Sequence, residues 1–221
     1  MALLRIMSIN LLLDRAVPHD LRRVIADSDP DAICTQEMGP DTAAVVADAL
    51  PHGHLEPRED LFGLGIATKH PVTVERLDME DRSAWVARLE PGAWPGLTGS
   101  LDVFDVHLPN PVERPWRETR DTRRRQIAQI AAEVERRDTP SVVIGDMNAT
   151  PIWREYKLLA EVGVDAARAT GTARRTWAHF LSGPRLLRID HAFVAGVQPI
   201  STSVARVGGT DHRALILDIE A

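Results

Sequence analysis

Cysteine is nearly absent from this sequence, which holds one, Cys34, among 221 residues. A single cysteine excludes an internal disulfide, and Cys34 stands in the apolar segment AICTQ, where a thiol behaves as a small hydrophobic group. A chain of this length buries about 70% of the surface that its unfolded form exposes, so its core needs no disulfide and no structural metal. The cysteine usage fits a reducing compartment, and we expect a cytoplasmic protein.

Long apolar runs are also lacking, since none reaches the roughly 18 residues of a membrane-spanning helix. The N-terminal stretch MALLRIMSINLLLDRA is only briefly apolar, carries Arg5 and has no A-x-A cleavage pattern, so it predicts a first strand and not a signal peptide. Repeats, low-complexity tracts and linkers are missing as well. We therefore expect a single domain over residues 1–221, no membrane span, and a monomer.

Positive charge is in deficit, because 26 Lys and Arg face 32 Asp and Glu, which gives a net charge of -6. This balance argues against a protein that coats nucleic acid by bulk attraction, but a local basic patch can still serve an enzyme that cuts it. Aromatic residues make up only 5% of the chain, which offers few platforms for stacking single-stranded bases.

Short apolar runs bounded by Gly, Pro, Asp or Asn predict the strands. They lie near residues 3–9, 31–36, 62–68, 84–89, 101–108, 141–146, 189–195 and 213–219. The clearest helix is predicted over 122–137, where apolar residues recur at helical spacing, namely Ile127, Ile130, Ala131 and Val134. Further helices are predicted over 18–26, 41–50 and 151–160, the last with Pro151 at its first position.

The order of these elements indicates the fold class. Strands alternate with helices at first and then follow one another like hairpins from residue 62 to residue 108. This mixture favours a mixed α/β sandwich over a purely parallel wound sheet. We interpret the Pro- and Gly-rich stretch EPGAWPGLTGS, residues 90–100, as a hairpin loop, because strand patterning resumes directly after it.

Polar side chains stand where the predicted strands end. Loops at one rim of a sandwich converge, and function concentrates on loops that a rigid scaffold holds. These strand-end residues are Asn10, Gln36, Glu37, His107, Asp146, Asn148, Asp190, Asp211 and His212. Each one alone is typical of a cap or a satisfied core group, but together they form a candidate site.

The segment VVIGDMNATP, residues 142–151, passes from an apolar strand directly to Asp146 and Asn148. Taken alone, GDMN is typical of a turn, since Gly tolerates positive φ and Asp or Asn can hydrogen-bond the nearby backbone. Hard cations such as Mg²⁺ bind carboxylates together with other oxygens, and Glu37, Asp211 and Asn10 offer such a set. The oxygen-rich set therefore indicates a divalent cation, and no Cys and His cluster competes for zinc.

Seven segments of the sequence share a pattern with one known family. They are SIN at 8–10, QE at 36–37, GLGIATKHPV at 63–72, VHLPNP at 106–111, GDMN at 145–148, RIDHAF at 188–193 and TDHRA at 210–214. In this order they resemble the endonuclease/exonuclease/phosphatase superfamily, which includes deoxyribonuclease I, exonuclease III, sphingomyelinases and inositol-polyphosphate phosphatases. The resemblance implies a four-layer α/β sandwich, with two mixed β-sheets packed face to face and helices on the outer faces.

The resemblance also implies a metal site for Mg²⁺ or Mn²⁺. Asn10 and Glu37 match the first metal-site residues of the family, and Asp211 matches their acidic partner. His107 and Asn110 fall where family members contact the phosphate. A phosphodiester is an anion attacked by a weak nucleophile, so such a site must neutralise the phosphoryl oxygens and position a water molecule.

Catalytic roles follow from the same resemblance. Asp146 matches the residue that activates or orients the attacking water, and Asn148 one that holds the water or the phosphate. His212 matches the catalytic histidine and Asp190 the carboxylate that orients it, an arrangement that fixes the tautomer of the imidazole. The motifs leave open whether Asp146 or His212 is the general base.

Three departures from the family pattern weaken parts of this comparison. Leu64 stands in GLGIATKHP where a polar residue is common, and no second carboxylate matches the partner of His107 in the deoxyribonuclease I branch. The chain is also short for the family, so the long insertions that shape substrate grooves in many members are small or missing.

Other polar residues have two interpretations each. His191 follows Asp190 on a strand and therefore points to the opposite face, so we interpret it as structural. Trp177 and His179 either line the pocket or pack in the core. The segment WRETRDTRRR, residues 116–125, holds five arginines and is either a solvated helix start or a phosphate-gripping rim. In the second case, Arg117, Arg120 and Arg124 would bind substrate.

These patterns predict a divalent-metal-dependent hydrolase of phosphate esters, in the first place a nuclease or other phosphodiesterase. The alternative is a phosphatase or phosphodiesterase for a small molecule or lipid headgroup. A non-catalytic binding module on the same fold is disfavoured, because every position of the matched site holds a chemically competent residue.

Overall fold

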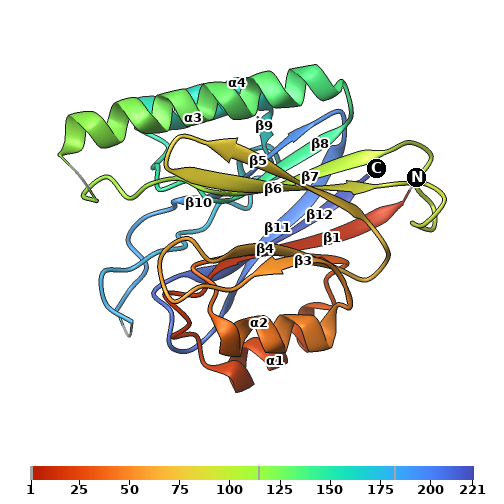
Figure 1. Ribbon diagram of the computed structural model, residues 1–221, viewed down its shortest axis with the longest axis horizontal. Coiled ribbons are helices and arrows are strands. Elements are labelled where there is room, and N and C mark those ends of the chain that lie inside the picture. Colours follow the sequence, from red (N-terminus) through yellow and green to blue (C-terminus); the bar gives the residue numbers. More distant parts are fainter. Residues whose placement is uncertain (1, 114, 182) are drawn as a thin grey trace.

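The first four and last two strands of the chain form one sheet, and the six strands between them form the other. The computed structural model describes residues 2–113, 115–181 and 183–221, and within these residues it contains two mixed sheets of six strands each. The sheets pack face to face and helices cover their outer faces, as Figure 1 shows. The four-layer α/β sandwich is confirmed.

In the first sheet the strand order is β11–β12–β1–β2–β4–β3. The bounds are β1 Leu3–Asn10, β2 Ala32–Gln36, β3 His52–Glu56, β4 Leu64–Thr68, β11 Gln198–Arg206 and β12 Arg213–Glu220. β1 and β2 run parallel, because helix α1 (Pro18–Ser28) carries the chain back between them. Their register sets Asn10 opposite Gln36, so both strands end at the same rim.

In the second sheet the strand order is β5–β6–β7–β8–β10–β9. The bounds are β5 Thr73–Met79, β6 Arg82–Leu89, β7 Leu101–His107, β8 Ser141–Asp146, β9 Val164–Asp165 and β10 Asp190–Ala195. β7 and β8 are parallel and are connected through helix α3 (Trp116–Arg137). The register places Asp146 opposite both His107 on β7 and Asp190 on β10.

Three apolar layers hold these elements together. The layer between the sheets includes Ile6, Cys34, Ile66, Val103 and Ile144. Helices α1 and α2 (Pro40–Ala49) pack on the outer face of the first sheet, and α3 and α4 (Arg154–Val162) on that of the second. A short helix, α5 (Ala166–Ala169), follows β9. The helical period predicted for residues 122–137 is confirmed, because Ile127 and Ile130 are buried while Ala131 and Val134 pack against the same cluster.

The observed elements depart from the predicted ones mainly at the edges of the sheets. The strands that the sequence did not predict are β3, β5, β9 and β11, which are the edge strands of the two sheets in the described residues. Helix α3 begins at Trp116 and not at residue 122. The predicted start of α4 at Pro151 is wrong, because residues 151–153 form a turn in which the Trp153 N–H donates to the Thr150 carbonyl at 3.0 Å.

Residues 90–100 connect the antiparallel strands β6 and β7, which confirms the hairpin loop. Among the described residues, no helix has the length and apolar character required to cross a membrane.

Candidate active site

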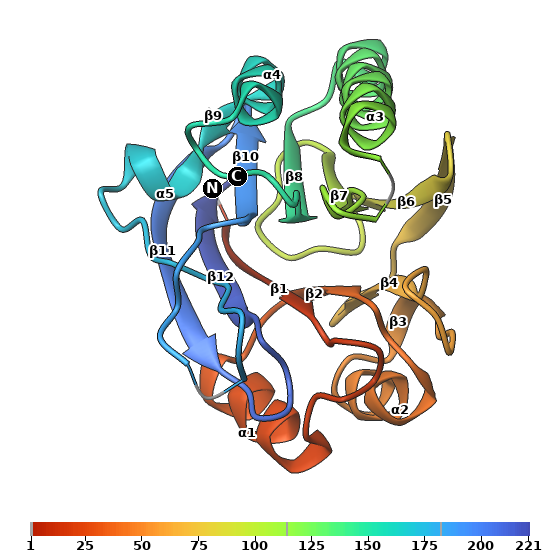
Figure 2. The same ribbon diagram turned by 90° about the vertical axis from the view of Figure 1, so that its left-hand side faces the viewer.

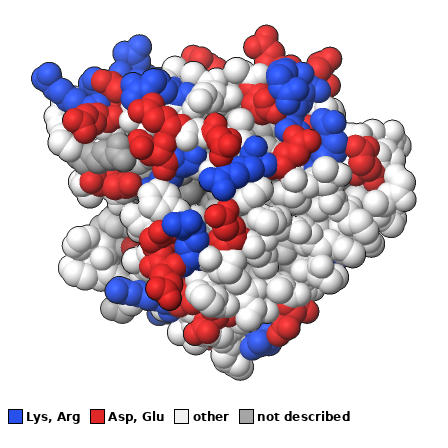
Figure 3. Space-filling view, in the orientation of Figure 1, with Lys and Arg blue, Asp and Glu red and all other residues white. Residues whose placement is uncertain are grey.

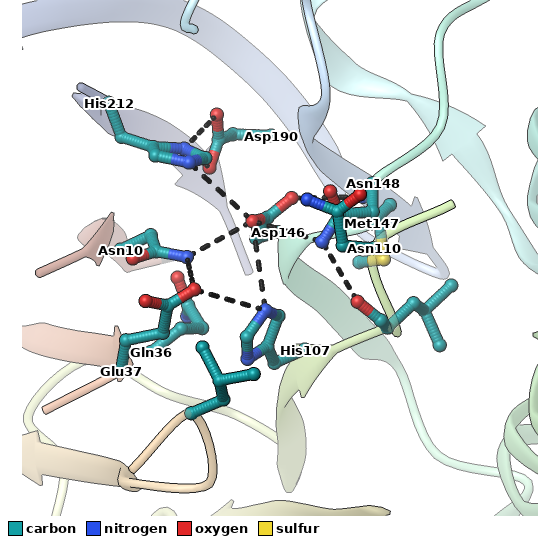
Figure 4. A network of polar contacts seen from close by, with 12 residues as sticks. Asn10, Gln36, Glu37, His107, Asn110, Asp146, Met147, Asn148, Asp190 and His212 are labelled. Atoms are coloured by element: carbon teal, nitrogen blue, oxygen red, sulfur yellow. Dashed lines mark hydrogen bonds and ion pairs between the residues drawn. The ribbon is translucent and has the colours of Figure 1, made fainter. Parts of the chain in front are cut away.

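The polar residues at the strand ends meet at one rim of the sandwich, which faces the viewer in Figure 2. Strands β1, β2, β7 and β8 end there, and β10 and β12 begin there. Asn10, Glu37, Asp211 and His212 come from the first sheet or the loops beside it, while His107, Asp146, Asn148 and Asp190 come from the second. The site is therefore built across the interface between the two sheets (Figure 4).

The backbone of GDMN fits only a limited choice of residues. Gly145 has φ +145, and a Cβ there would lie 2.0 Å from the carbonyl oxygen of Val106 on the neighbouring strand. Asn148 has φ +47, a left-handed conformation that Asn tolerates better than most residues. These two positions let β8 approach β7 closely and then turn at once, so that Asp146 and Asn148 both face the rim.

Asp146 lies at the centre of the network. Its Oδ1 accepts the backbone N–H of Asn148 at 2.9 Å, and its Oδ2 accepts from the side-chain amides of Asn10 at 3.1 Å and Asn148 at 3.3 Å. Asp146 as a whole is 1% exposed. Burial, together with the nearby negative charge of Asp190, raises the pKa of Asp146 to about 7, although His212 acts in the opposite direction.

Asp190 and His212 form a buried pair. The Nδ1 of His212 lies 3.0 Å from each carboxylate oxygen of Asp190, and its Nε2 lies 3.7 Å from the Oδ2 of Asp146. Burial lowers the pKa of His212, but the charges of Asp190 and Asp146 outweigh it and raise the pKa to about 10. These two acids favour the protonated form of the imidazole, whose Nε2 is directed at Asp146.

His107 is also buried, but its pKa is shifted in the opposite direction to that of His212. Its Nε2 lies 3.7 Å from the Oε1 of Glu37 and 3.8 Å from the Oδ2 of Asp146. Burial and the positive charges of Arg82 and His212 lower the pKa of His107 well below its ordinary value. The pKa values of the two histidines on either side of Asp146 are therefore shifted in opposite directions, upward for His212 and downward for His107.

Asn10 connects the two carboxylates that face it. Its side-chain oxygen accepts the Leu12 N–H at 2.9 Å, which fixes the orientation of the amide. The NH₂ group then donates to the Oε1 of Glu37 at 3.0 Å and to Asp146 on the other sheet. Burial raises the pKa of Glu37, while the hydrogen bond from Asn10 lowers it.

Asp211 completes the rim on the side of β12. Its Oδ2 accepts the indole N–H of Trp177 at 2.8 Å. Its Oδ1 is buried, has no hydrogen-bond partner among the described residues and lies 3.8 Å from the Nε2 of His212. A carboxylate oxygen left open in this way can take a cation or a water molecule.

A second layer of polar groups supports the site from below. Asp105, on β7, is fully buried and accepts from the Nε2 of Gln36 at 2.5 Å and from the Thr35 N–H at 3.1 Å on the other sheet. Burial raises the pKa of Asp105 well above its ordinary value. Asp105 is not among the residues predicted from the sequence, although an acid inside the apolar strand LDVFDVH is a signal that could have found it.

Arg123 is a second residue that the sequence analysis missed. It is 3% exposed and its Nη2 donates to the carbonyls of Met147 at 3.3 Å and Asn148 at 2.7 Å. On the other side of the same loop, the Nε2 of His191 lies 2.8 Å from the carbonyl oxygen of Ala149. His191 is fully buried and points away from Asp190, as expected, so it supports the GDMN loop from behind.

The four predicted substrate contacts have hydrogen bonds or ring contacts with residues outside the network around Asp146. Asn110 is exposed and its side-chain oxygen accepts the Val112 N–H at 3.1 Å. Arg120 donates to Asp121 at 3.0 Å, Arg124 donates to Glu155 at 3.1 Å, and the exposed Arg117 lies 5.8 Å from the ring centre of Trp116. Within the described residues, none of these four makes a hydrogen bond or ion pair to the network around Asp146.

A match to a known family shows to which proteins the chain is related. The chain matches the model of the Endonuclease/Exonuclease/phosphatase family over residues 7–212. The chain belongs to this family. Members of the Endonuclease/Exonuclease/phosphatase family are generally phosphoester hydrolases that typically use divalent metals. Among the described residues, Asp146, Asp190 and His212 form a group that could bind such an ion, with ligand atoms within 4.8 Å of one another.

Solved structures share the fold at low sequence identity, and no curated protein sequence matches the chain. The endonuclease/exonuclease/phosphatase from Beutenbergia cavernae DSM 12333 is 19% identical with a TM-score of 0.78, and the match covers 100% of this chain and 72% of that one. The endonuclease/exonuclease/phosphatase from Bacteroides vulgatus is also 19% identical with a TM-score of 0.78, over 100% and 99% of the two chains. D. rerio TDP2 complexed with single strand DNA product is 16% identical with a TM-score of 0.72, over 100% of both chains.

Proposed function

We propose that the protein is a phosphodiesterase that depends on Mg²⁺ or Mn²⁺, with nucleic acid as the leading substrate class. The observation that carries this proposal is the buried chain of contacts from Asp190 through His212 to Asp146, beside the carboxylates of Glu37 and Asp211. Membership of a family of phosphoester hydrolases supports it, as does the DNA product in the similar TDP2 structure.

The donor set fits a hard divalent cation. Glu37 and the partnerless Oδ1 of Asp211 are oxygen ligands of the kind that Mg²⁺ and Mn²⁺ prefer, and Asn10 assists by orienting Glu37. A cation bound there supplies positive charge that stabilises the phosphoryl oxygens. We assign the tighter group of Asp146, Asp190 and His212 to proton transfer, because the Nδ1 of His212 is already engaged by Asp190.

The electrostatics favour Asp146 as the general base. Its pKa of about 7 suits a carboxylate that must take a proton from water near neutral pH, and Asn148 holds it in place with two donors. His212, kept protonated, directs its Nε2 to the same space and can donate a hydrogen bond to a phosphoryl oxygen. His107 remains neutral and contacts the phosphate from the other side.

The arginines of α3 have a smaller part in this proposal than the sequence pattern indicates. Arg120 and Arg124 are already paired with carboxylates, so we propose no direct phosphate contact for them. Arg117 and Asn110 remain candidates for outer contacts with a longer substrate. A small-molecule or lipid-headgroup phosphodiesterase is the second candidate, favoured by this pairing of the basic side chains at the rim.

A substrate panel tests the proposal. Single- and double-stranded DNA, bis(p-nitrophenyl) phosphate, p-nitrophenyl phosphate and phospholipid vesicles are assayed with Mg²⁺, Mn²⁺ or excess chelator. We expect hydrolysis of diesters only with metal, and a loss of about 10²–10³-fold in Glu37→Gln, as for other lost transition-state contacts. Glu133→Gln, which removes the same charge at the far end of α3, is the control. Undiminished turnover in chelator or in Glu37→Gln would refute the metal site.

A further inference from the structure

A strip of three residues, 176–178, joins the segments that lead into β10 of one sheet and β12 of the other. On one side it pairs with the backbone of residues 211–213, through hydrogen bonds of 3.1 and 2.9 Å. On the other side its first two N–H groups donate to the Leu187 carbonyl at 2.8 and 3.0 Å, and the hydroxyl of its first residue accepts the Asp190 N–H at 3.3 Å. The backbone of the middle residue, Trp177, is therefore held from both sides.

The indole N–H of Trp177 is committed to Asp211. Trp177 is half-buried, and its Nε1 donates to the Oδ2 of Asp211 at 2.8 Å. An indole has one donor and no acceptor, so this bond uses its whole hydrogen-bonding capacity. The Oδ1 of the same carboxylate is buried and has no hydrogen-bond partner within the described part of the chain. The contact with Trp177 thus determines which oxygen of Asp211 is left open.

Core packing does not account for the place of Trp177. None of the three apolar layers, as far as the structure describes them, includes its side chain, and the neighbouring ring of His179 is exposed, with 6.2 Å between the two ring centres. Trp94 shows the contrasting case, since it is buried in the layer between the sheets and its indole N–H donates to the Pro71 carbonyl at 3.0 Å. Trp94 belongs to the β6–β7 loop, at the end of the sandwich opposite the candidate site.

A cation at the rim depends on the orientation of its local ligands. On the face seen in Figure 3, Lys and Arg are interspersed with Asp and Glu, so this face offers no broad negative field that would attract a cation. The carboxylate of Asp211 can rotate about its Cβ–Cγ bond unless a neighbour holds it. Partners outside the ligand set commonly hold metal-ligating side chains in this way.

We propose that Trp177 is a positioning residue, which holds Asp211 so that its Oδ1 faces the divalent cation. Trp177 acts through Asp211 and needs no contact with the cation. Loss of such a partner typically costs about 10–100-fold in metal affinity or activity. The inference rests on the proposed function and deepens it, because it adds a residue on which the strength of metal binding depends.

Mn²⁺ binding to the substrate-free protein tests this role without turnover, with free Mn²⁺ measured by electron paramagnetic resonance. We expect Trp177→Phe, which removes the N–H but keeps an aromatic ring, to weaken binding by about 10–100-fold. In the Asp211→Ala background, the same substitution should change the affinity by less than about twofold, because the two residues act together. Trp94→Phe, which also loses one indole hydrogen bond, should keep the wild-type affinity. Circular dichroism checks the folding of each variant.

The indole N–H signals in ¹⁵N–¹H spectra give a second measurement, which does not require Trp177→Phe to fold. The chain has five tryptophans, and we expect the signal of one of them to move as Mg²⁺ is added to the wild type. In Asp211→Ala the same signal should be displaced and should no longer respond to Mg²⁺. A merely structural tryptophan would not report on the cation in this way.

The outcomes separate the role of Trp177 from the proposed function. Wild-type Mn²⁺ affinity in Trp177→Phe, an equal loss with and without Asp211, or indole signals that ignore Mg²⁺ would each overturn the positioning role. In those cases a loss of Mn²⁺ binding in Glu37→Gln would still support the metal site of the proposed function. A wild type that binds no Mn²⁺ would refute that metal site and the role of Trp177 with it.

Discussion

Asp190 sets the orientation of the His212 ring. Asp190 contacts the Nδ1 of His212 with both carboxylate oxygens at 3.0 Å, which leaves only Nε2 to face Asp146 and the substrate. Loss of Asp190 or of His212 should therefore remove the same contribution to catalysis, namely an imidazole whose Nε2 faces Asp146 and the substrate.

The Asp190–His212 pair should behave as one unit in kinetics. We expect Asp190→Asn, His212→Ala and the double variant to lose similar amounts of kcat/KM, because groups that act together are strongly non-additive. Steady-state assays on a diester with Mg²⁺ measure this. A double variant whose loss equals the product of the two single losses would show that the residues act independently.

Local motifs account for the residues that the sequence predicted at the site. Asp146 and Asn148 are set by the GDMN turn itself, and His212 by its position at the start of a strand. The supporting contacts of Asp105 and Arg123 could not be inferred in this way, because their partners, Gln36 and Met147, are distant in the chain and meet them only in the folded protein. For the same reason the sequence does not reveal that Arg124 pairs with Glu155 on another helix, and its contact with substrate stays a prediction.

Arg123 should support both stability and turnover. Arg123→Met leaves the carbonyls of Met147 and Asn148 without their donor, so we expect a loss of about 1–3 kcal/mol in the free energy of unfolding. We also expect a lower kcat with little change in KM, since the GDMN loop loses its support. Denaturant titration and kinetics measure the two effects. Arg125→Met, an exposed neighbour that pairs with Glu80, should stay within about 0.5 kcal/mol of wild type.

At the level of secondary structure, the central strands could be predicted and the edge strands could not. Central strands such as β8 are buried along their whole length, so their sequences are continuous apolar runs. The edge strand β5, TVERLDM, is exposed or half-buried at all but one position and carries charged residues, so it has no such run. Its place in the sheet is set by its pairing with β6.

The last turns of α3 contain an ion-pair cluster that should respond to acid. Hydrogen bonds from Arg136 and then Arg137 lower the pKa of Glu133 from its ordinary value of 4.5 to about 2. A lowered carboxyl pKa contributes stability above the ordinary value, and that stability is lost as the pH falls toward the folded-state value. We expect Glu133→Gln to be less stable at pH 7 by about 0.5 kcal/mol. The difference should vanish between pH 4.5 and 2 in urea melts, and one that persists at pH 2 would contradict the assignment.

The whole molecule has a net charge of -6, and the basic residues Arg120 and Arg124 near its active rim are paired with acids. A protein that neutralises many phosphates loses affinity steeply with salt, whereas one that grips a single phosphate does not. We expect binding to a DNA duplex, measured with Ca²⁺ in place of Mg²⁺, to show a log–log salt slope of only about -1 to -3. A slope that corresponds to about six or more phosphates would instead indicate a protein that tracks along the groove.

Because the site draws its residues from both sheets, the apolar layer between them sets the spacing of the catalytic groups. Asn10 and Asp146, like His212 and Asp190, meet only when that layer has its proper thickness. Ile66 lies in this layer, whereas Ile130 belongs to α3 and packs in the apolar layer between that helix and the second sheet; both are fully buried. Ile66→Val and Ile130→Val should each cost about 0.5–1.5 kcal/mol of stability, but only the first should reduce kcat. Packing between the sheets thus sets the distances between the catalytic groups. A smaller side chain in that layer should lower kcat while the protein is still folded.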